Sequence, residues 1–432
     1  MASPHMEDEE SYMLPNSRVM EKKKKTAHQH FSTLKFSKWQ TWTFGTVVTL
    51  ALVWVFFHLG SSKPSTSIPQ KSDWNTVVPE RVSLPNDFSG PYTSNTVNST
   101  LGFGKIFVIH LPYRSDKKDQ LLMMSRLQGI DMTFINARTP SELKQSGLPW
   151  QSKEFQETRR TGVASWRSHS DAIQAILEND LSSALILEDD GDWDMDVKYQ
   201  MAQLHQPFAT LINSFNKPAN ATLLSSTKDD PWLSSEWDVI NFGTCLDQPF
   251  GENDHIGEID LKHPPLVAYE DKTLADLEDT LPQNRDIMNK YNYTAPSRSQ
   301  PNAQQTNGMK HRRLAILTNK AVCLNGYAVS RKGAMKLLYH YSKGITEPID
   351  LAYAGLSNKG LIRSWSVIPA IMTQWKIQDS EHRNSDIFFP DSGKFVQEAD
   401  TSNHNPWVGH APSLKNSARR YIKELVESNR PF

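Results

Sequence analysis

The chain has 432 residues, a length that accommodates two domains or one large α/β domain with appended segments. Hydrophobic residues make up 38% and charged residues 22%, which is typical of a chain that mostly folds. The formal net charge of −1 argues against nucleic-acid binding through bulk electrostatic attraction. The two cysteines, Cys245 and Cys323, exclude a cysteine-rich metal cluster and are either buried thiols or one disulfide.

The N-terminal region contains a long segment without charge. Residues 1–38 are polar and mixed in charge, and we expect a disordered cytosolic tail. Residues 41–59 would span roughly 28 Å as a helix, about one hydrocarbon core. Trp39 and Trp42 stand at one edge, where indole rings prefer the membrane interface. We interpret residues 39–60 as an uncleaved signal anchor, with a buried core helix as the alternative.

Charge around this segment predicts its orientation. Lysines are concentrated before it, and positive residues stay cytosolic, so the larger C-terminal part is expected in the lumen of the Golgi or the endoplasmic reticulum, as in a single-pass type II membrane protein. Residues 61–100 are rich in Ser, Pro, Asn and Thr and read as a stem. The N-glycosylation sequons on the luminal side begin at Asn98, Asn220 and Asn292. In that oxidising compartment the two cysteines can pair.

The folded region is predicted to begin near residue 103. An apolar run at 105–111, a polar helix over 115–129 and a strand over 132–136 form a β-α-β unit. Further predicted elements are a helix over 162–179, strands over 184–187 and 237–243, and a strand-turn-helix over 327–339 with Ser330 and Gly333 at the turn. This alternation predicts a doubly wound α/β sheet. The polar region 280–312 is interpreted as a long loop insertion.

The strongest chemical signal is Glu188-Asp189-Asp190, directly after the apolar strand 184–187. In open α/β sheets ligands bind at the edge where the strands end. Three adjacent carboxylates repel one another, and a divalent cation with oxygen ligands offsets that repulsion. Such a cation would also neutralise a departing diphosphate. An exposed acidic loop is the alternative interpretation.

Four sequence blocks, in order, resemble glycosyltransferase family 25, the lipooligosaccharide β-galactosyltransferases and collagen galactosyltransferases. They are 107–117, where His110 replaces the usual Asn; 162–172, with Ser168-His169; 184–192; and 325–334 followed by 347–350, with a weaker match at 385–387. The resemblance implies a GT-A-like, Rossmann-type nucleotide-sugar-binding domain over 101–390, with a C-terminal extension at 391–432. It also implies a UDP-sugar donor, galactose by family default, Mn²⁺ and an inverting transfer.

The resemblance assigns roles to several residues. Asp190 would hold Mn²⁺ against the diphosphate, and Glu188 would face the ribose or the sugar, with Asp189 in the same donor-binding element. Arg114 and Lys117 would contact the nucleotide, or are solvated turn residues.

An inverting transfer needs one base to take the proton of the acceptor hydroxyl. Asp350 is the first candidate, with a helix N-cap as the alternative, and Asp386 is the second. His382 could complete the metal shell, whereas His169 more simply orients a loop or stabilises its helix. A Cys245–Cys323 bridge would tie both ends of the insertion to the core.

The activity itself has a competing interpretation. An intact acidic cluster favours a transferase acting on a glycan, glycoprotein or glycolipid. His110 in place of the usual Asn and the irregular spacing of the second block favour an inactive luminal carbohydrate-binding protein on the same fold. A transferase using a lipid-phosphate donor is disfavoured, because those enzymes have more membrane-embedded surface.

Overall fold

The computed structural model describes residues 98–157, 159–216, 224–250, 254–256, 259–261, 265–291, 311–377, 386 and 405–428. No helix within these ranges is long and apolar enough to cross a membrane. The predicted cytosolic tail, the anchor at 39–60 and most of the stem lie outside the described residues, as do His382, Asn220 and Asn292.

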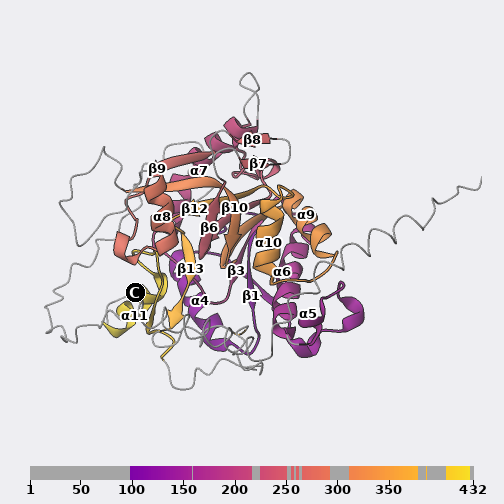
Figure 1. Ribbon diagram of the computed structural model, residues 1–432. Helices are drawn as coiled ribbons and strands as arrows, with labels where there is room; N and C mark the ends of the chain where they lie inside the picture. Colours follow the sequence, from indigo (N-terminus) through magenta and orange to yellow (C-terminus); the bar gives the residue numbers. More distant parts are fainter. Residues whose placement is uncertain are drawn as a thin grey trace, which may run out of the picture. The chain divides into compact units, whose positions relative to one another are not determined.

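A nine-stranded sheet forms the centre of the fold (Figure 1). In spatial order its strands are β2 (Thr133–Asn136), β1 (Lys105–His110), β3 (Ser183–Glu188), β11 (Gly326–Ser330), β5 (Val239–Gly243), β12 (Ser364–Ile368), β10 (Arg312–Val322) and β6 (Leu246–Pro249), and β9 (Leu266–Glu270) also pairs with β10. Only β11 and β10 run against the common direction of the described strands of this sheet. The predicted α/β sheet is therefore confirmed as a mostly parallel one.

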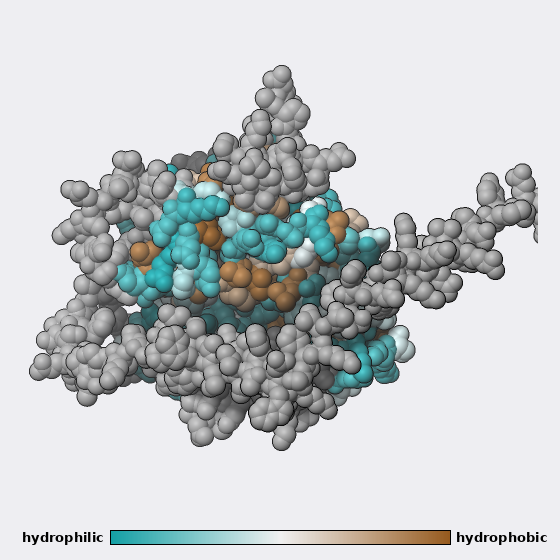
Figure 2. Space-filling view, in the orientation of Figure 1, coloured by the Kyte–Doolittle hydropathy of each residue, from teal (hydrophilic) through white to brown (hydrophobic). Residues whose placement is uncertain are grey.

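Helices cover both faces of this sheet because its strands carry apolar side chains on both faces. On β3, Leu185 and Leu187 pack in one hydrophobic cluster, while Ala184 and Ile186 pack in the other. The first cluster includes residues of α4 (Ser115–Gln128), α7 (Val197–Asn216) and α11 (Ala418–Glu427), and the second those of α6 (Arg160–Glu178), α9 (Arg331–Tyr341) and α10 (Ile349–Asn358). The surface in Figure 2 is correspondingly hydrophilic over much of its coloured area, with a smaller hydrophobic group near its middle.

Shorter elements complete the described structure. Two-stranded pairs are formed by β4 (Gly191–Trp193) with β13 (Met372–Gln374), by β14 (Lys376–Ile377) with β15 (Gly409–His410), and by β7 (Asp254–Ile256) with β8 (Ile259–Leu261). The remaining helices are α5 (Lys153–Glu157), α8 (Pro282–Lys290) and the 3₁₀ turns η1 (Pro140–Glu142), η2 (Gln145–Gly147), η3 (Ser234–Glu236) and η4 (Leu277–Asp279). At the predicted strand-turn-helix, Ser330 Oγ accepts a bond of 3.0 Å from the N–H of Gly333 and caps α9.

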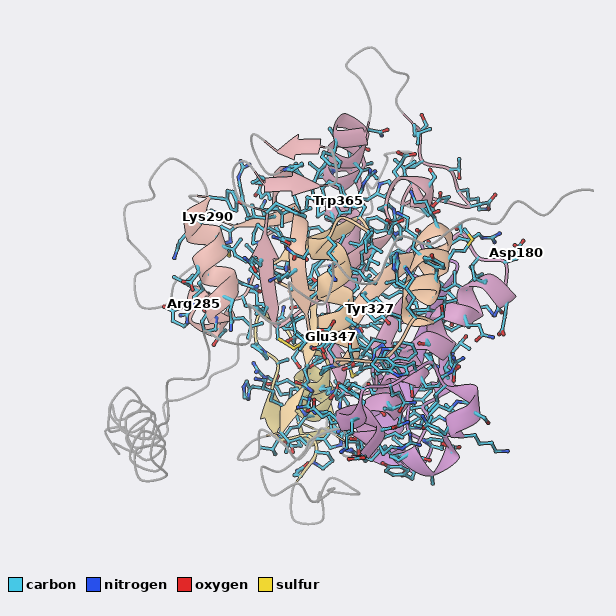
Figure 3. All side chains as sticks on the ribbon, turned by 45° about the vertical axis from the view of Figure 1, so that its right-hand side comes forward. Asp180, Arg285, Lys290, Tyr327, Glu347 and Trp365 are labelled. Carbon is cyan, nitrogen blue, oxygen red and sulfur yellow. A yellow bond between two sulfur atoms is a disulfide. The ribbon has the colours of Figure 1, made fainter. Side chains whose placement is uncertain are left out.

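The predicted loop insertion at 280–312 is wrong where the structure describes it. Its first part forms α8, whose Ile287 and Met288 pack with Leu314 and Ile316 of β10. Figure 3 shows Arg285 and Lys290 on this peripheral helix, away from the central Tyr327. The polar composition concealed the helix because only one narrow face of it is buried.

The C-terminal residues 405–428 are an integral part of the same fold rather than a separate extension. β15 pairs with β14, and Ala418 and Ile422 of α11 lie in the first hydrophobic cluster. A boundary at residue 390 therefore does not separate these C-terminal elements from the domain.

Candidate active site

The carboxyl ends of β1 and β3 lie side by side, because these parallel strands align Ile109 with Glu188. Directly after β1 the chain turns into α4, and directly after β3 it forms the turn Asp189-Asp190. A cavity of about 800 Å³ opens at this edge. Its described lining includes Lys117 and Asp189, Arg138 after β2, Arg160 and His169 of α6, and Gln374 and Asp386 from later in the chain.

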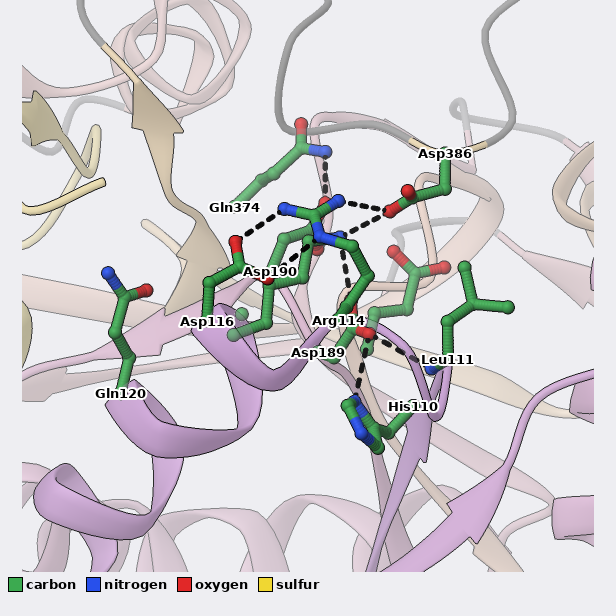
Figure 4. Close-up of polar contacts among 12 residues, drawn as sticks. His110, Leu111, Arg114, Asp116, Gln120, Asp189, Asp190, Gln374 and Asp386 are labelled. Carbon is green, nitrogen blue, oxygen red and sulfur yellow. Dashed lines mark hydrogen bonds and ion pairs between the residues drawn. The ribbon is translucent and has the colours of Figure 1, made fainter. Parts of the chain in front are cut away.

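Asp189 is held as a buried anion (Figure 4). Its Oδ1 lies 2.8 Å from Lys117 Nζ, and its Oδ2 accepts a bond of 3.2 Å from the N–H of Leu111 and lies 3.3 Å from His110 Nδ1. Burial alone would raise the pKa of Asp189, but the charge of Lys117 and these hydrogen bonds hold it well below its usual value. Asp189 thus joins the ends of β1, β3 and α4.

The predicted nucleotide-binding cations are buried beside this carboxylate. Asp386 Oδ2 lies 2.6 Å from Arg114 Nη1 and 2.8 Å from Lys117 Nζ. Arg114 also binds Asp116 through Nε at 2.9 Å and Nη2 at 2.8 Å. Burial opposes the charge on Arg114 and Lys117, but the neighbouring carboxylates keep the pKa of both above its usual value. The solvated-turn alternative is therefore wrong for both cations.

Asp190 carries an unpaired buried oxygen. Its Oδ2 accepts a bond of 2.8 Å from Gln374 Nε2, and its Oδ1 has no hydrogen-bond partner among the described residues. Burial raises the pKa of Asp190 to about 6; Lys117 opposes this shift, and the negative charges of Glu188 and Asp189 add to it. Oδ1 of Asp386 is likewise buried and unpartnered within the described chain.

Each of these oxygens suits a divalent cation, because a buried carboxylate oxygen without a donor lacks the compensation that a cation supplies. The described residues hold no group of three His, Cys, Asp or Glu side chains arranged around one metal position. A cation here would therefore take its other ligands from phosphate oxygens and water, as Mg²⁺-type sites do. His382 lies outside the described residues, so its predicted role as a ligand remains a prediction.

Glu188 stands at the cavity with 28% of its side chain exposed. Its Oε1 lies 3.2 Å from His169 Nε2, and His169 Nδ1 lies 2.9 Å from the hydroxyl of Tyr327. The N–H of Glu188 donates a bond of 3.2 Å to the carbonyl of Asn325. Residues of the second, third and fourth sequence blocks therefore meet around Glu188, and His169 contacts its carboxylate directly.

Asp350 is not among the described residues that line the cavity. Its Oδ1 accepts a bond of 2.9 Å from the N–H of Leu351 and its Oδ2 one of 3.4 Å from the N–H of Cys323, in the first turn of α10. The N-cap of α10 is Pro348, so the N-cap alternative for Asp350 is wrong, and its role as the base stays a prediction. Cys323 is bonded to Cys245, with 5.5 Å between their Cα atoms.

Several residues of this site carried no interpretable signal in the sequence. His110 marks only a departure from the family pattern, yet it contacts Asp189. Gln374 and Arg419 lie outside every recognised block, and both bind the acidic turn.

The predicted glycosylation site Asn98 lies at the N-terminal end of the described residues, and its side chain is exposed. Its Oδ1 accepts bonds from the N–H groups of Thr100 and Gly102.

Comparison with known proteins gives the family. The model of glycosyltransferase family 25 (LPS biosynthesis protein) matches residues 103–353. A search of curated proteins found no match. The matched region covers more than half of the chain and contains β1, α6, β3 and β11, the elements that meet at the cavity. The chain therefore belongs to glycosyltransferase family 25 and is a glycosyltransferase.

Proposed function

We propose that the protein uses a divalent cation, Mn²⁺ by preference, to transfer a sugar from a UDP-sugar to a glycan, glycoprotein or glycolipid acceptor with inversion. The observation that carries the proposal is the unpartnered, buried Oδ1 of Asp190, beside Lys117 at the carboxyl edge of the sheet. Galactose is the donor sugar that the family favours. The GT-A-like arrangement of donor and cation rests on the mostly parallel sheet and its acidic turn.

The cation would be held by Asp190, and when bound it would neutralise charge on the departing diphosphate. Lys117 lines the cavity and would contact the donor phosphates, and Arg114, which shares Asp386 with Lys117, would contact the nucleotide once that carboxylate engages the cation. Asp189 keeps Lys117 in position. Glu188, held by His169, would accept a hydrogen bond from a hydroxyl of the ribose or the sugar.

Asp386 has two possible roles in this scheme. Its Oδ2 is held by two cations, while its Oδ1 is free of described donors, so the carboxylate is fixed and has one available oxygen. That oxygen can complete the cation shell or take the acceptor proton. Asp386→Asn separates the two roles: weaker Mn²⁺ binding indicates a ligand, whereas a lowered kcat with unchanged Mn²⁺ affinity indicates the base.

The main test is a screen of the detergent-solubilised full chain against nucleotide sugars, with Mn²⁺ and with EDTA. We expect turnover of one UDP-sugar only with the cation, and a loss of about 10²-fold or more in kcat/KM for Asp190→Asn. Asp180→Asn is the matched control, because the Asp180 side chain is 89% exposed. If no nucleotide sugar is bound or hydrolysed while glycan binding survives Asp190→Asn, the carbohydrate-binding alternative is correct.

We also propose that the protein is a single-pass type II membrane protein of the Golgi or endoplasmic reticulum with this domain in the lumen. The Cys245–Cys323 bond and the exposed Asn98 support the proposal, since disulfides and N-glycans both belong to that compartment. Carbonate extraction and digestion of N-glycans test it. An unglycosylated protein released by carbonate would contradict it.

A further inference from the structure

The C-terminal segment supplies a buried arginine to the back of the active site. Arg419 lies in the first turn of α11, beyond the family match at 103–353, and is fully buried. The hydroxyl of Ser417, the N-cap of this helix, donates a bond of 2.5 Å to Asp192 Oδ2. The N–H groups of Lys415 and Asn416 donate to Asp194. The start of α11 is therefore hydrogen-bonded to the residues that directly follow the acidic turn.

The guanidinium of Arg419 holds this turn through its main chain. Nη2 donates bonds of 3.2 Å to the carbonyl of Asp189 and 2.9 Å to the carbonyl of Gly191. The carbonyl of Asp190, between them, accepts a bond of 2.8 Å from the N–H of Trp375. Three consecutive carbonyls of the turn are thus held by hydrogen bonds, while Asp190 itself lines the cavity.

The same guanidinium connects the turn to α4, because its Nη1 donates to Gln120 Oε1. Gln120, labelled on that helix in Figure 4, comes one helical turn after Lys117 in the sequence. Gln120 Nε2 donates a bond of 3.1 Å to the carbonyl of Pro406, which also accepts one of 3.0 Å from Trp375 Nε1. One arginine therefore sets the spacing between the acidic turn and the helix that carries the cation Lys117.

Charge supports this role. Burial lowers the pKa of Arg419, and the carboxylates of Asp192, Asp190 and Asp189 oppose that shift. A buried cation without such anions is costly, and so are adjacent buried carboxylates without a cation. Arg419 donates its hydrogen bonds to uncharged oxygens of the described chain, so it does not occupy the carboxylate of Asp190, whose Oδ1 has no described donor.

We propose that Arg419 is a positioning residue of the active site: by holding the carbonyls on both sides of Asp190, it fixes that carboxylate for cation and donor binding. The C-terminal segment is then part of the catalytic unit although it lies outside the matched family region. The proposal rests on the proposed function, because it assigns the cation to Asp190.

The experiment compares the full chain with Arg419→Lys and Arg419→Ala, measuring Mn²⁺ dissociation constants by EPR of free Mn²⁺, donor KM and kcat, and thermal unfolding. Residues that orient metal ligands typically change metal affinity by 10–100-fold, so we expect Mn²⁺ binding to weaken by about 10-fold or more in both variants. Guanidinium ion added to Arg419→Ala should restore part of this affinity, which a merely structural loss would not show.

Arg313→Lys is the matched control. Arg313 is equally buried and donates to two carbonyls, those of Pro369 and Ala370, but it pairs with Asp271. We expect a lower unfolding temperature with Mn²⁺ affinity within about 2-fold of wild type. Gln120→Leu removes one hydrogen-bond acceptor of Arg419 and serves as the test if the Arg419 variants do not fold. We expect it to weaken Mn²⁺ binding by about 3-fold or more.

Two failures are distinguishable. The role of Arg419 is overturned, and the proposed function stands, if folded Arg419→Lys binds Mn²⁺ as tightly as wild type. If the Arg419 variants do not fold, wild-type Mn²⁺ affinity in Gln120→Leu has the same meaning. A wild-type chain that binds no Mn²⁺ and turns over no nucleotide sugar overturns the proposed function, and the role of Arg419 with it.

Discussion

Nε2 of His169 lies 3.2 Å from Oε1 of Glu188, although the two residues come from separate sequence blocks. The other ring nitrogen, Nδ1, is 2.9 Å from the hydroxyl of Tyr327, so the imidazole is fixed at both ends. All three side chains lie between α6, β3 and β11, and Glu188 reaches the cavity. The orientation of this carboxylate therefore depends on a tyrosine of an antiparallel strand.

Tyr327→Phe tests that dependence. The variant leaves His169 Nδ1 without its partner, and a net loss of about 1 kcal/mol in orientation would lower kcat/KM by roughly 5-fold. Steady-state kinetics with the accepted donor measures the effect. Tyr339→Phe is the control, since Tyr339 is 63% exposed, and should change nothing. A wild-type kcat/KM in Tyr327→Phe as well as in Tyr339→Phe would show that Glu188 does not depend on Tyr327.

Lys117→Met should destabilise the fold by about 3–5 kcal/mol, because it leaves Asp189 and Asp386 as buried carboxylates without their common cation. Chemical denaturation measures the free energy of unfolding. Adding Asp189→Asn to Lys117→Met should recover part of the loss. Lys272→Met, at a site 76% exposed, is the control and should stay within about 0.5 kcal/mol of wild type. A double variant less stable than Lys117→Met alone would argue against the pairing.

Gly333→Ala should prevent normal packing of α9. A Cβ at this position would lie 2.1 Å from the carbonyl oxygen of Asp238, which is main chain and cannot rotate away. We expect a loss of about 3 kcal/mol or more in the free energy of unfolding. Gly147→Ala is the matched control, because nothing lies within 4 Å of its added Cβ. Similar unfolding temperatures for the two variants would contradict the close approach.

Asp247 should make stability depend on pH. Burial raises its pKa in the folded protein from 3.8 to about 6, while hydrogen bonds such as that from the Thr244 hydroxyl partly oppose the shift. Between these values the folded state keeps a proton that the unfolded state has lost. The free energy of unfolding therefore falls as pH rises through this window, by up to about 3 kcal/mol from this group.

Denaturation curves of wild type and Asp247→Asn between pH 4 and pH 7.5 measure this contribution as the difference between them. The free energy of unfolding of Asp247→Asn should lack this part of the decline, so the stability of the variant relative to wild type should increase as pH rises. Asp180→Asn serves as the surface control and should follow wild type throughout. A constant difference between wild type and Asp247→Asn across this range would rule out the buried titration.

The local pattern of the sequence was sufficient for much of the sheet. The apolar runs at 105–111 and 184–187 became β1 and β3, because short apolar runs of this kind are typical of strands buried on both faces. The predicted turn at Ser330 and Gly333 is confirmed, and the structure shows that Ser330 caps α9 there. Polar composition misled at α8, where three buried residues, Asn284, Ile287 and Met288, are enough to dock a helix.

The sequence by itself determined the family, the order of the central elements and the position of the acids at the end of a buried strand, since each depends on neighbouring residues. Only the tertiary structure decided which side chains meet there. Asp386 reaches Lys117 across 269 positions, and Arg419 reaches Asp189 across 230, while Asp350 turns to a helix start instead. Such contacts arise from the packing of whole elements, and no local periodicity encodes them.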